Sequence, residues 1–366
     1  MNDAKIADIL EPRLQEENSK ENSSKPVIGL PANYADTEET RLLLTPEACG
    51  LLTSAGWRIV MEIGAGVDIS FSDEAYAEYG VELRQRAEVL RCENVITFAP
   101  LNEEDIRSMQ EGATLLCMMG LELFDLKTVK ALLEKRITLG CLDSMYSFND
   151  DPVFANVLKE IDGRAAIMYA QDHLSFLGGG KGVLLAGVAG INPCEVLIIG
   201  EGMDAFAAAS AAIAAGAQVT LLNNDVSVLA AARQLCGEHL VTLAIHPRVL
   251  TNKCKTADVL ILSSTTRPFE FPNKLNRLMK ESAFVIDLQK QHPSVSVPRT
   301  VAMAMSNIMV NFLQDMLLKG GFEGMMCLDG VNHGVVTYRG KLCDKLIASY
   351  LGMPSVDIKM MLAAKN

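Results

Sequence analysis

The sequence has little positive charge, few aromatic residues and no basic stripe. It carries 33 Lys and Arg against 45 Asp and Glu, for a formal net charge of −12 over 366 residues. Because nucleic acids are recognised first through their phosphates by clustered cations, we expect no nucleic-acid partner. Aromatic residues make up 5% of the chain and 49% of all residues are apolar, so the core must be mainly aliphatic.

Paired cysteines and long apolar runs are also missing. The nine cysteines are odd in number and never form a C-x-x-C pair, which favours free thiols in a reducing cytoplasm and predicts no metal site. The N-terminus has no cationic start followed by an apolar segment, so we expect no signal peptide. The longest small-residue run, 205–217, is too short for a bilayer. We therefore expect a cytoplasmic protein without a membrane span.

Aliphatic runs alternate with helix-start signals from Val27 onward. Residues 27–30 form the first predicted strand, and Thr45 followed by Pro46 is typical of a helix N-cap and first turn. Further runs continue this alternation, which predicts a first α/β unit over about 26–150. Residues 1–25 are polar and charged, and we interpret them as a mobile tail.

A second α/β unit follows a predicted helix over 152–177. The glycines around Lys181 suggest a P-loop, but no Ser or Thr follows that lysine, so we interpret them as a turn. A long helix is predicted over 305–319, followed by a helix-rich end. The unit itself contains five predicted strands, over 194–200, 217–222, 240–245, 258–263 and 283–288.

The first of these strands ends in a turn of the dinucleotide-binding type. Gly200 and Gly202 permit a tight turn close to a diphosphate, and Ala205 takes the third small position as a helix begins. However, Glu201 and Asp204 lie where the diphosphate would dock. Carboxylates there complement the helix dipole and repel a second anion.

The next strand also departs from a dinucleotide site. Asn223 stands where an acid normally binds the ribose hydroxyls, and its neutral amide makes weaker hydrogen bonds. Asp225 is more simply the N-cap of the following helix. His173 follows Asp172 and His333 follows Asn332; a catalytic role is possible for either, but we interpret both as structural. We therefore expect NAD to bind weakly or not at all.

Several segments, taken together, have a pattern that occurs in one known family: 28–31, 39–47, 62–66, 71–76 and 178–190, with 306–309, 320–321, 334–335 and 340–342 in the tail. They resemble the alanine dehydrogenases and the α subunit of proton-translocating nicotinamide nucleotide transhydrogenase. The resemblance implies two Rossmann-like, doubly wound domains: a discontinuous substrate domain over 26–151 and 306–366, and a central NAD-type domain over 152–305. The chain after Asp287 is shorter than in the family, which predicts a shortened central sheet.

The resemblance implies oxidation of L-alanine to pyruvate and ammonia with NAD, in a hexamer. The family's carboxylate-binding arginine falls on Arg41. The substrate-binding lysine falls on Ala99, the catalytic histidine on Gly120, and the active-site aspartate near Gln291. At three of the four positions, the resemblance therefore implies that the reactive side chain of the family is absent.

Three hypotheses follow. The first is a catalytically impaired relative, a pseudoenzyme that forms a homo-oligomer or a hetero-oligomer with an active relative. The second is an active NAD-dependent oxidoreductase on another amino or keto acid, which uses Arg41 and an unrecognised base. The third is a binder of a small carboxylate metabolite that performs no turnover.

Overall fold

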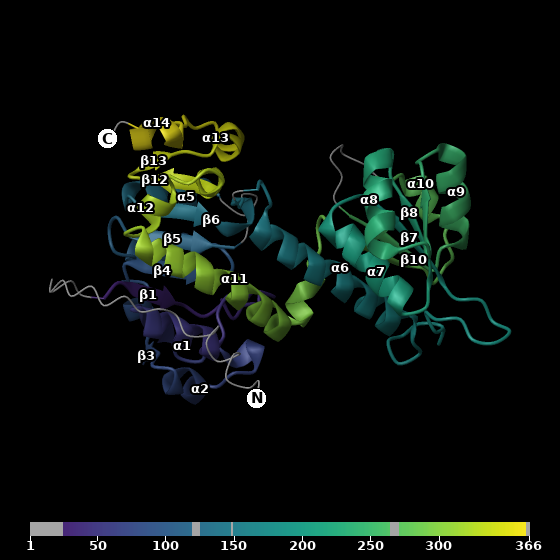
Figure 1. Cartoon of the computed structure of the whole chain (residues 1–366), viewed down its shortest axis with the longest axis horizontal. Coiled ribbons are helices and arrows are strands. Elements are labelled where there is room, and N and C mark those ends of the chain that lie inside the picture. Colours follow the sequence, from purple (N-terminus) through teal and green to yellow (C-terminus); the bar gives the residue numbers. More distant parts are fainter. Residues whose placement is uncertain (1–24, 119–124, 148, 264–270, 364–366) are drawn as a thin grey trace, which may run out of the picture.

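Two largely parallel sheets organise the chain, and they lie in separate lobes (Figure 1). The computed structural model describes residues 25–118, 125–147, 149–263 and 271–363. The predicted α/β class with two doubly wound units is confirmed. The predicted mobile tail lies almost wholly outside the described residues.

The first lobe contains an eight-stranded sheet in the order β13-β12-β6-β5-β4-β1-β2-β3. Six strands are parallel, while β12 runs antiparallel to β6 and β13 antiparallel to β12. The C-terminal part of the chain therefore extends the sheet that the N-terminal part begins. The strands are β1 (Val27–Leu30), β2 (Arg58–Glu62), β3 (Glu82–Arg84), β4 (Asn94–Thr97), β5 (Thr114–Cys117), β6 (Thr138–Cys141), β12 (Val335–Tyr338) and β13 (Lys341–Leu342).

Helices cover both faces of this sheet. One face packs against α1 and α11, and the other against α3, α4 and α5. Thr45 caps α1 through its hydroxyl, as its sequence position predicts, and Ser72 caps α2 in the same way. The helices are α1 (Pro46–Ala55), α2 (Asp73–Glu78), α3 (Arg86–Val89), α4 (Glu103–Ser108), α5 (Leu126–Glu134), α12 (Phe322–Met325), α13 (Lys345–Leu351) and α14 (Ile358–Ala363).

The second lobe contains a five-stranded, all-parallel sheet in the order β11-β10-β7-β8-β9. This is the dinucleotide-fold order without its sixth strand. Residues 288–297 form a turn and a short 3-10 helix, η5 (Pro293–Ser296), so β11 is the edge and the predicted shortening is confirmed. The elements are β7 (Glu195–Ile199), β8 (Gln218–Leu222), β9 (Leu240–Leu243), β10 (Val259–Leu262), β11 (Phe284–Asp287), α7 (Met203–Ala214), α8 (Val226–Cys236), α9 (Pro247–Thr256) and α10 (Asn273–Asn276).

Two long helices connect the lobes. The first, α6 (Val153–Leu174), ends three residues before the predicted end because Ser175 turns to an extended conformation. The second, α11 (Pro298–Leu318), begins seven residues before the predicted start, because Pro298 is placed in the first turn, where proline is tolerated. By length and composition α11 could cross a membrane, but half of its most apolar window is buried inside the protein.

The contact between α6 and α7 depends on the absence of a side chain at Gly163. A Cβ atom built there would lie 2.2 Å from the carbonyl oxygen of Asp204 and 2.9 Å from the amide nitrogen of Ala208. Both neighbouring atoms are backbone and cannot rotate away. The two helix axes can therefore approach closely only with glycine at this position.

We expect Gly163→Ala to destabilise the protein. Helix propensity alone would favour alanine by about 1 kcal/mol, whereas overpacking of a close contact costs about 1–3 kcal/mol. The net effect should lower the midpoint of thermal unfolding by a few degrees, measured by circular dichroism. Arg164→Ala, at the exposed neighbouring position, should change the midpoint little. A higher midpoint for Gly163→Ala would contradict the close approach.

Candidate functional site

In each sheet there is one point at which successive strands are added first on one side and then on the other, so that the strand order reverses. In open α/β sheets such points, at the carboxyl ends of the strands, are where ligands bind. In the first lobe the point lies between β1 and β4, and in the second between β7 and β10. These two edges carry the site residues that the sequence singles out.

Arg41 lies at the first of these points. Its guanidinium stacks over the ring of Phe98, which follows β4, with 4.2 Å between Cζ and the ring centroid. The Nε and Nη2 atoms donate to the two carboxylate oxygens of Glu39 at 2.7 and 2.6 Å. The side chain is 1% exposed. A buried guanidinium needs such a partner because an uncompensated charge in the interior is costly.

A distant segment completes the surroundings of Arg41. Its Nη1 donates to the hydroxyl of Ser294 at 2.9 Å, and Ser294 lies in η5, the segment that replaces the missing edge of the second sheet. The Thr40 hydroxyl donates to the carbonyl of Val295 at 2.6 Å. The abbreviated connection therefore packs directly on the arginine loop.

η5 is held in turn by α6. The amide of Ser294 donates to Asp162 Oδ1 at 2.8 Å, and Asp162 is 5% exposed. The other carboxylate oxygen of Asp162 lies 3.5 Å from Nδ1 of His292. Glu39, Arg41, Ser294 and Asp162 thus form one continuous buried polar path from the first lobe to the connecting helix.

The other three predicted substrate-site residues, Ala99, Gly120 and Gln291, carry no charged side chain. Ala99 directly follows Phe98 and is half-buried. Gln291 is exposed, and its Oε1 accepts from the amide of Asp287 at 3.2 Å, so it closes the turn after β11. Gly120 lies outside the described residues.

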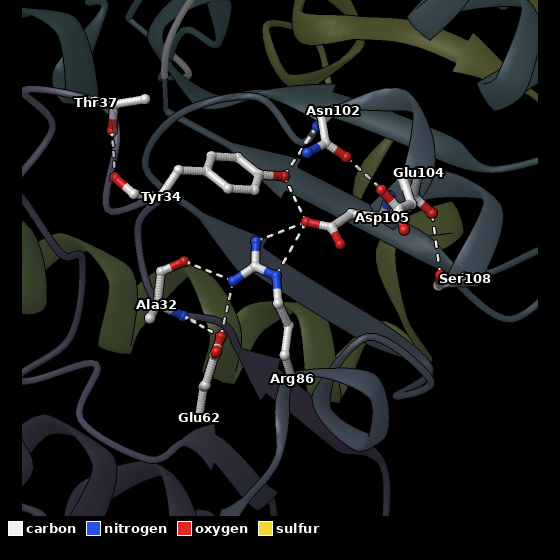
Figure 2. Close-up of polar contacts among 9 residues, drawn as sticks. All are labelled: Ala32, Tyr34, Thr37, Glu62, Arg86, Asn102, Glu104, Asp105 and Ser108. Atoms are coloured by element: carbon white, nitrogen blue, oxygen red, sulfur yellow. Dashed lines mark hydrogen bonds and ion pairs between the residues drawn. The ribbon is translucent and has the colours of Figure 1, made fainter.

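A polar network that the sequence analysis missed lies beside this point, at the carboxyl edge of β1 to β4 (Figure 2). Arg86 donates from Nε and Nη2 to Asp105 Oδ2 at 3.0 and 2.6 Å, and from Nη1 to Glu62 Oε2 at 2.8 Å. Tyr34 donates its hydroxyl to the same oxygen of Asp105, and burial is the main cause that raises its pKa to about 12.

This network fixes the start of the loop that carries Arg41. Glu62 accepts from the amide of Ala32, Arg86 donates to the carbonyl of Ala32, and the guanidinium of Arg86 stacks 4.6 Å from the ring of Tyr34. The residues come from four separate strand ends and helix starts. No local motif joins them, which is why sequence spacing could not identify the network.

The carboxyl of Asp143 is a further feature that the sequence analysis missed. Asp143 follows β6 at the same carboxyl edge, is half-buried, and accepts from the Ser144 hydroxyl at 3.1 Å. Burial raises the pKa of its carboxyl from 3.8 to about 6, against the smaller opposing effects of the Ser144 hydrogen bonds and the positive charge of Lys159. Carboxyls that titrate this close to neutrality occur often at functional sites.

The dinucleotide-type turn lies at the reversal point of the second sheet. Gly200 and Gly202 have φ of 142° and 91°, which only glycine adopts easily, and α7 starts directly after them. Ser263, which follows β10, donates its hydroxyl to the carbonyl of Glu201 at 2.9 Å. Ala205 is fully buried against the sheet. The backbone of a nucleotide-binding turn is therefore present.

The side chains at this turn interact with one another. Asn223 is 7% exposed and donates its amide to the carbonyl of Gly200 at 2.9 Å and to the carboxylate of Glu201 at 3.3 Å. Its own oxygen accepts from the amide of Asp225, and Asp225 caps α8 as predicted. Asp204 is buried in the first turn of α7. Negative charge thus stands at the place where a diphosphate would bring more.

The two histidines that the sequence analysis set aside lie in ring contacts. His173 lies against Phe284 with 5.0 Å between ring centroids, and His333 against Tyr146 with 5.6 Å. Among the residues that the structure describes, no group of three or more His, Cys, Asp or Glu could hold a metal ion.

Comparison with known sequences covers most of the chain. Residues 29–155 match the family description "Alanine dehydrogenase/PNT, N-terminal domain", and residues 166–290 match "Alanine dehydrogenase/PNT, C-terminal domain". Alanine dehydrogenase of Bacillus subtilis is 26% identical, with 92% of this chain and 97% of that protein aligned. The alanine dehydrogenase of Methanococcus maripaludis is 28% identical over 72% of this chain and 71% of its own length.

Comparison with solved structures gives the same fold. An L-alanine dehydrogenase superimposes with a TM-score of 0.80 at 22% identity, covering 89% of this chain and 99% of that structure. A transhydrogenase from Sinorhizobium meliloti has a TM-score of 0.70 at 16% identity and covers 87% of this chain and 99% of that structure. With both lobes matched in sequence and fold, the chain belongs to the alanine dehydrogenase/PNT family.

Proposed function

We propose that this protein is a non-catalytic member of its family, which keeps the two-lobed fold but does not oxidise L-alanine with NAD. The single observation that carries the proposal is the state of Arg41, the retained cation of the reacting centre. It is 1% exposed and its guanidinium donates to Glu39 and Ser294. A substrate carboxylate would have to compete with a bidentate carboxylate and displace a packed segment.

The missing proton-transfer groups support the same conclusion. Ala99 and Gly120 replace a lysine and a histidine, and neither can hold or move a proton. A positioned acid or base contributes about 10²–10⁴-fold in rate, so the loss of two would leave a residual rate that is very low. This effect is too large to be a change in substrate preference.

The residues at the dinucleotide-type turn do not fit NAD. The carboxylate of Glu201 takes the amide of Asn223 at 3.3 Å, so the two side chains that should face the diphosphate and the ribose face each other. Asp204 adds a second carboxylate at the same helix start, and the positive end of the helix dipole, about half a charge, cannot offset both. We therefore infer that this protein has a structural or regulatory role. It would act either as a homo-oligomer or in a complex with an active member of the family.

A second candidate function is an active oxidoreductase on another amino or keto acid. Asp143 favours it, because a carboxyl with a pKa of about 6 at the carboxyl edge of the first sheet could act as the base that the sequence lacks. This candidate still requires NAD, and the turn at Glu201 weighs against it.

Binding of the cofactor is the first test. We expect no calorimetric binding of NAD at millimolar concentration and no rise in the thermal midpoint. Glu201→Ala removes the charge that faces the diphosphate site, and we expect measurable NAD binding by this variant. Glu281→Ala removes one exposed carboxylate from the same lobe and should not bind. Tight binding by the unchanged protein would contradict the proposal.

Turnover is the second test. With a panel of amino and keto acids, we expect no change in the near-ultraviolet absorbance of reduced nicotinamide above that of protein-free controls. Steady turnover of any substrate, abolished by both Arg41→Ala and Asp143→Asn, would establish the second candidate instead. Turnover that survives both substitutions would indicate a contaminating enzyme.

The raised pKa of Asp143 predicts a pH dependence of stability. Between about pH 4 and pH 6 the folded protein keeps this proton while the unfolded chain loses it, so the free energy of unfolding falls as the pH rises. The loss is complete above the folded-state pKa and amounts to at most about 3 kcal/mol. Asp143→Asn should therefore raise the thermal midpoint at neutral pH and leave it unchanged near pH 4. Asp36→Asn, at an exposed position, should do neither.

A further inference from the structure

A cavity in the first lobe lies apart from both sites described above. It is formed by the C-terminal end of α11, by α12 and by α14, and its volume is about 550 Å³. Cavities of this size commonly bind small molecules. α11 begins beside α6 and ends beside α12 (Figure 1), and its 21 residues span roughly 30 Å. The cavity is therefore at the opposite end of this helix from Ser294, the partner of Arg41.

One cysteine lines this cavity. All nine cysteines lie within the described ranges, and of these Cys327 is exposed, Cys236 is half-buried and the other seven are buried. Burial raises the pKa of the Cys92 and Cys343 thiols to about 11, and such thiols stay protonated and unreactive. The thiol that solvent reaches most readily is therefore the one in the cavity.

The charges that line the cavity leave one cation over. Its two carboxylates each have a cationic partner: Glu323 lies 3.0 Å from the guanidinium of Arg339, and Asp329 lies 3.5 Å from Nζ of Lys359. Lys319 also lines the cavity and forms no ion pair with any described residue. Although the chain has a net charge of −12, this thiol therefore shares a cavity with an unpaired cation. A nearby positive charge favours the thiolate, which is the reactive form of cysteine.

A buried amide without a partner points to a ligand in the same cavity. Asn332, in η6 (Val331–Gly334), is 7% exposed and lines the cavity. Within the part of the chain that the structure describes, its side-chain amide makes no hydrogen bond. Buried polar groups are normally satisfied, so an exception indicates a water, an ion or a ligand. The amide can donate to a carboxylate and accept from an N–H group, which matches a ligand of peptide character.

We propose that this cavity is a modification site, at which Cys327 forms a mixed disulfide with a small anionic peptide disulfide of the oxidised-glutathione class. The thiolate of Cys327 attacks one ligand sulfur, a new S–S bond forms, and the bond between the two ligand sulfurs breaks. The departing half leaves as a thiolate and takes up the proton that Cys327 released, so no further oxidant is needed. Lys319 and Asn332 hold the carboxylate and peptide groups of the half that stays. A reduced thiol reverses the reaction.

The first test is the intact mass of the folded full chain after incubation with oxidised glutathione. We expect the mass to rise by one glutathione unit, with the adduct on Cys327 after digestion, and to return on treatment with a reduced thiol. Cys327→Ser should abolish the adduct, whereas Cys236→Ser, which removes the half-buried thiol, should keep it. An unchanged mass, or an adduct on another cysteine, would overturn the proposal. The reaction needs neither NAD nor Arg41, so its outcome is distinct from that of the proposed function.

The second test is whether the cavity selects its ligand by charge. Oxidised glutathione should react with Cys327 about fivefold faster than cystamine, a disulfide with two amines, which is the effect expected of one partly exposed ion pair. Each rate is taken relative to that with a free thiol in solution. Lys319→Ala should remove most of this preference and Asn332→Ala part of it, while Lys341→Ala, at an exposed position in β13, should retain it.

Two outcomes of the second test would overturn the proposal. Equal relative rates for the two disulfides would show an exposed thiol without a ligand site. A preference that survives Lys319→Ala would show that the cavity does not supply the selectivity. Lys319 is exposed, so its substitution should leave the thermal midpoint unchanged, and this measurement confirms that the variant is folded.

Discussion

The structure around the candidate site depends on the need to neutralise one buried cation. Arg41 is almost fully buried, and an isolated guanidinium there would be prohibitively unstable. Glu39 supplies the compensating charge, two residues away in the sequence, and Ser294 supplies a further acceptor from 253 residues away. The second contact is the more informative, because it ties the connection between the lobes to the loop that carries Arg41.

The abbreviated segment after β11 packs on the loop that carries Arg41. Here the chain goes directly from the edge strand into η5, which packs between Asp162 and Arg41. A shortening that is visible in the sequence only as a difference in length thus has a structural consequence at the loop that carries Arg41.

In the function that we propose, the two lobes oppose their ligands by the same physical means. In the first, a carboxylate from the chain itself occupies the arginine. In the second, the carboxylate of Glu201 stands at a helix start that would otherwise attract a diphosphate, and Asn223 holds it. In both cases the backbone keeps the conformation expected of a binding site, while in our proposal side-chain charge opposes the ligand.

Much of this protein was determined by the sequence alone, because its signals are local. Aliphatic runs, the Thr45 cap and the glycines at 200 and 202 predicted strands, helix starts and the turn within a few residues. The start of α11 was misplaced because the apolar pattern begins later than the helix that Pro298 allows. Only the tertiary structure decided which distant groups meet, such as Arg41 with Ser294 and Arg86 with Asp105. It also decided that Asp143 is half-buried, which raises the pKa of its carboxyl. These pairings and the raised pKa depend on burial and on contacts between segments that are distant in the sequence. The spacing of residues along the chain specifies neither burial nor such contacts.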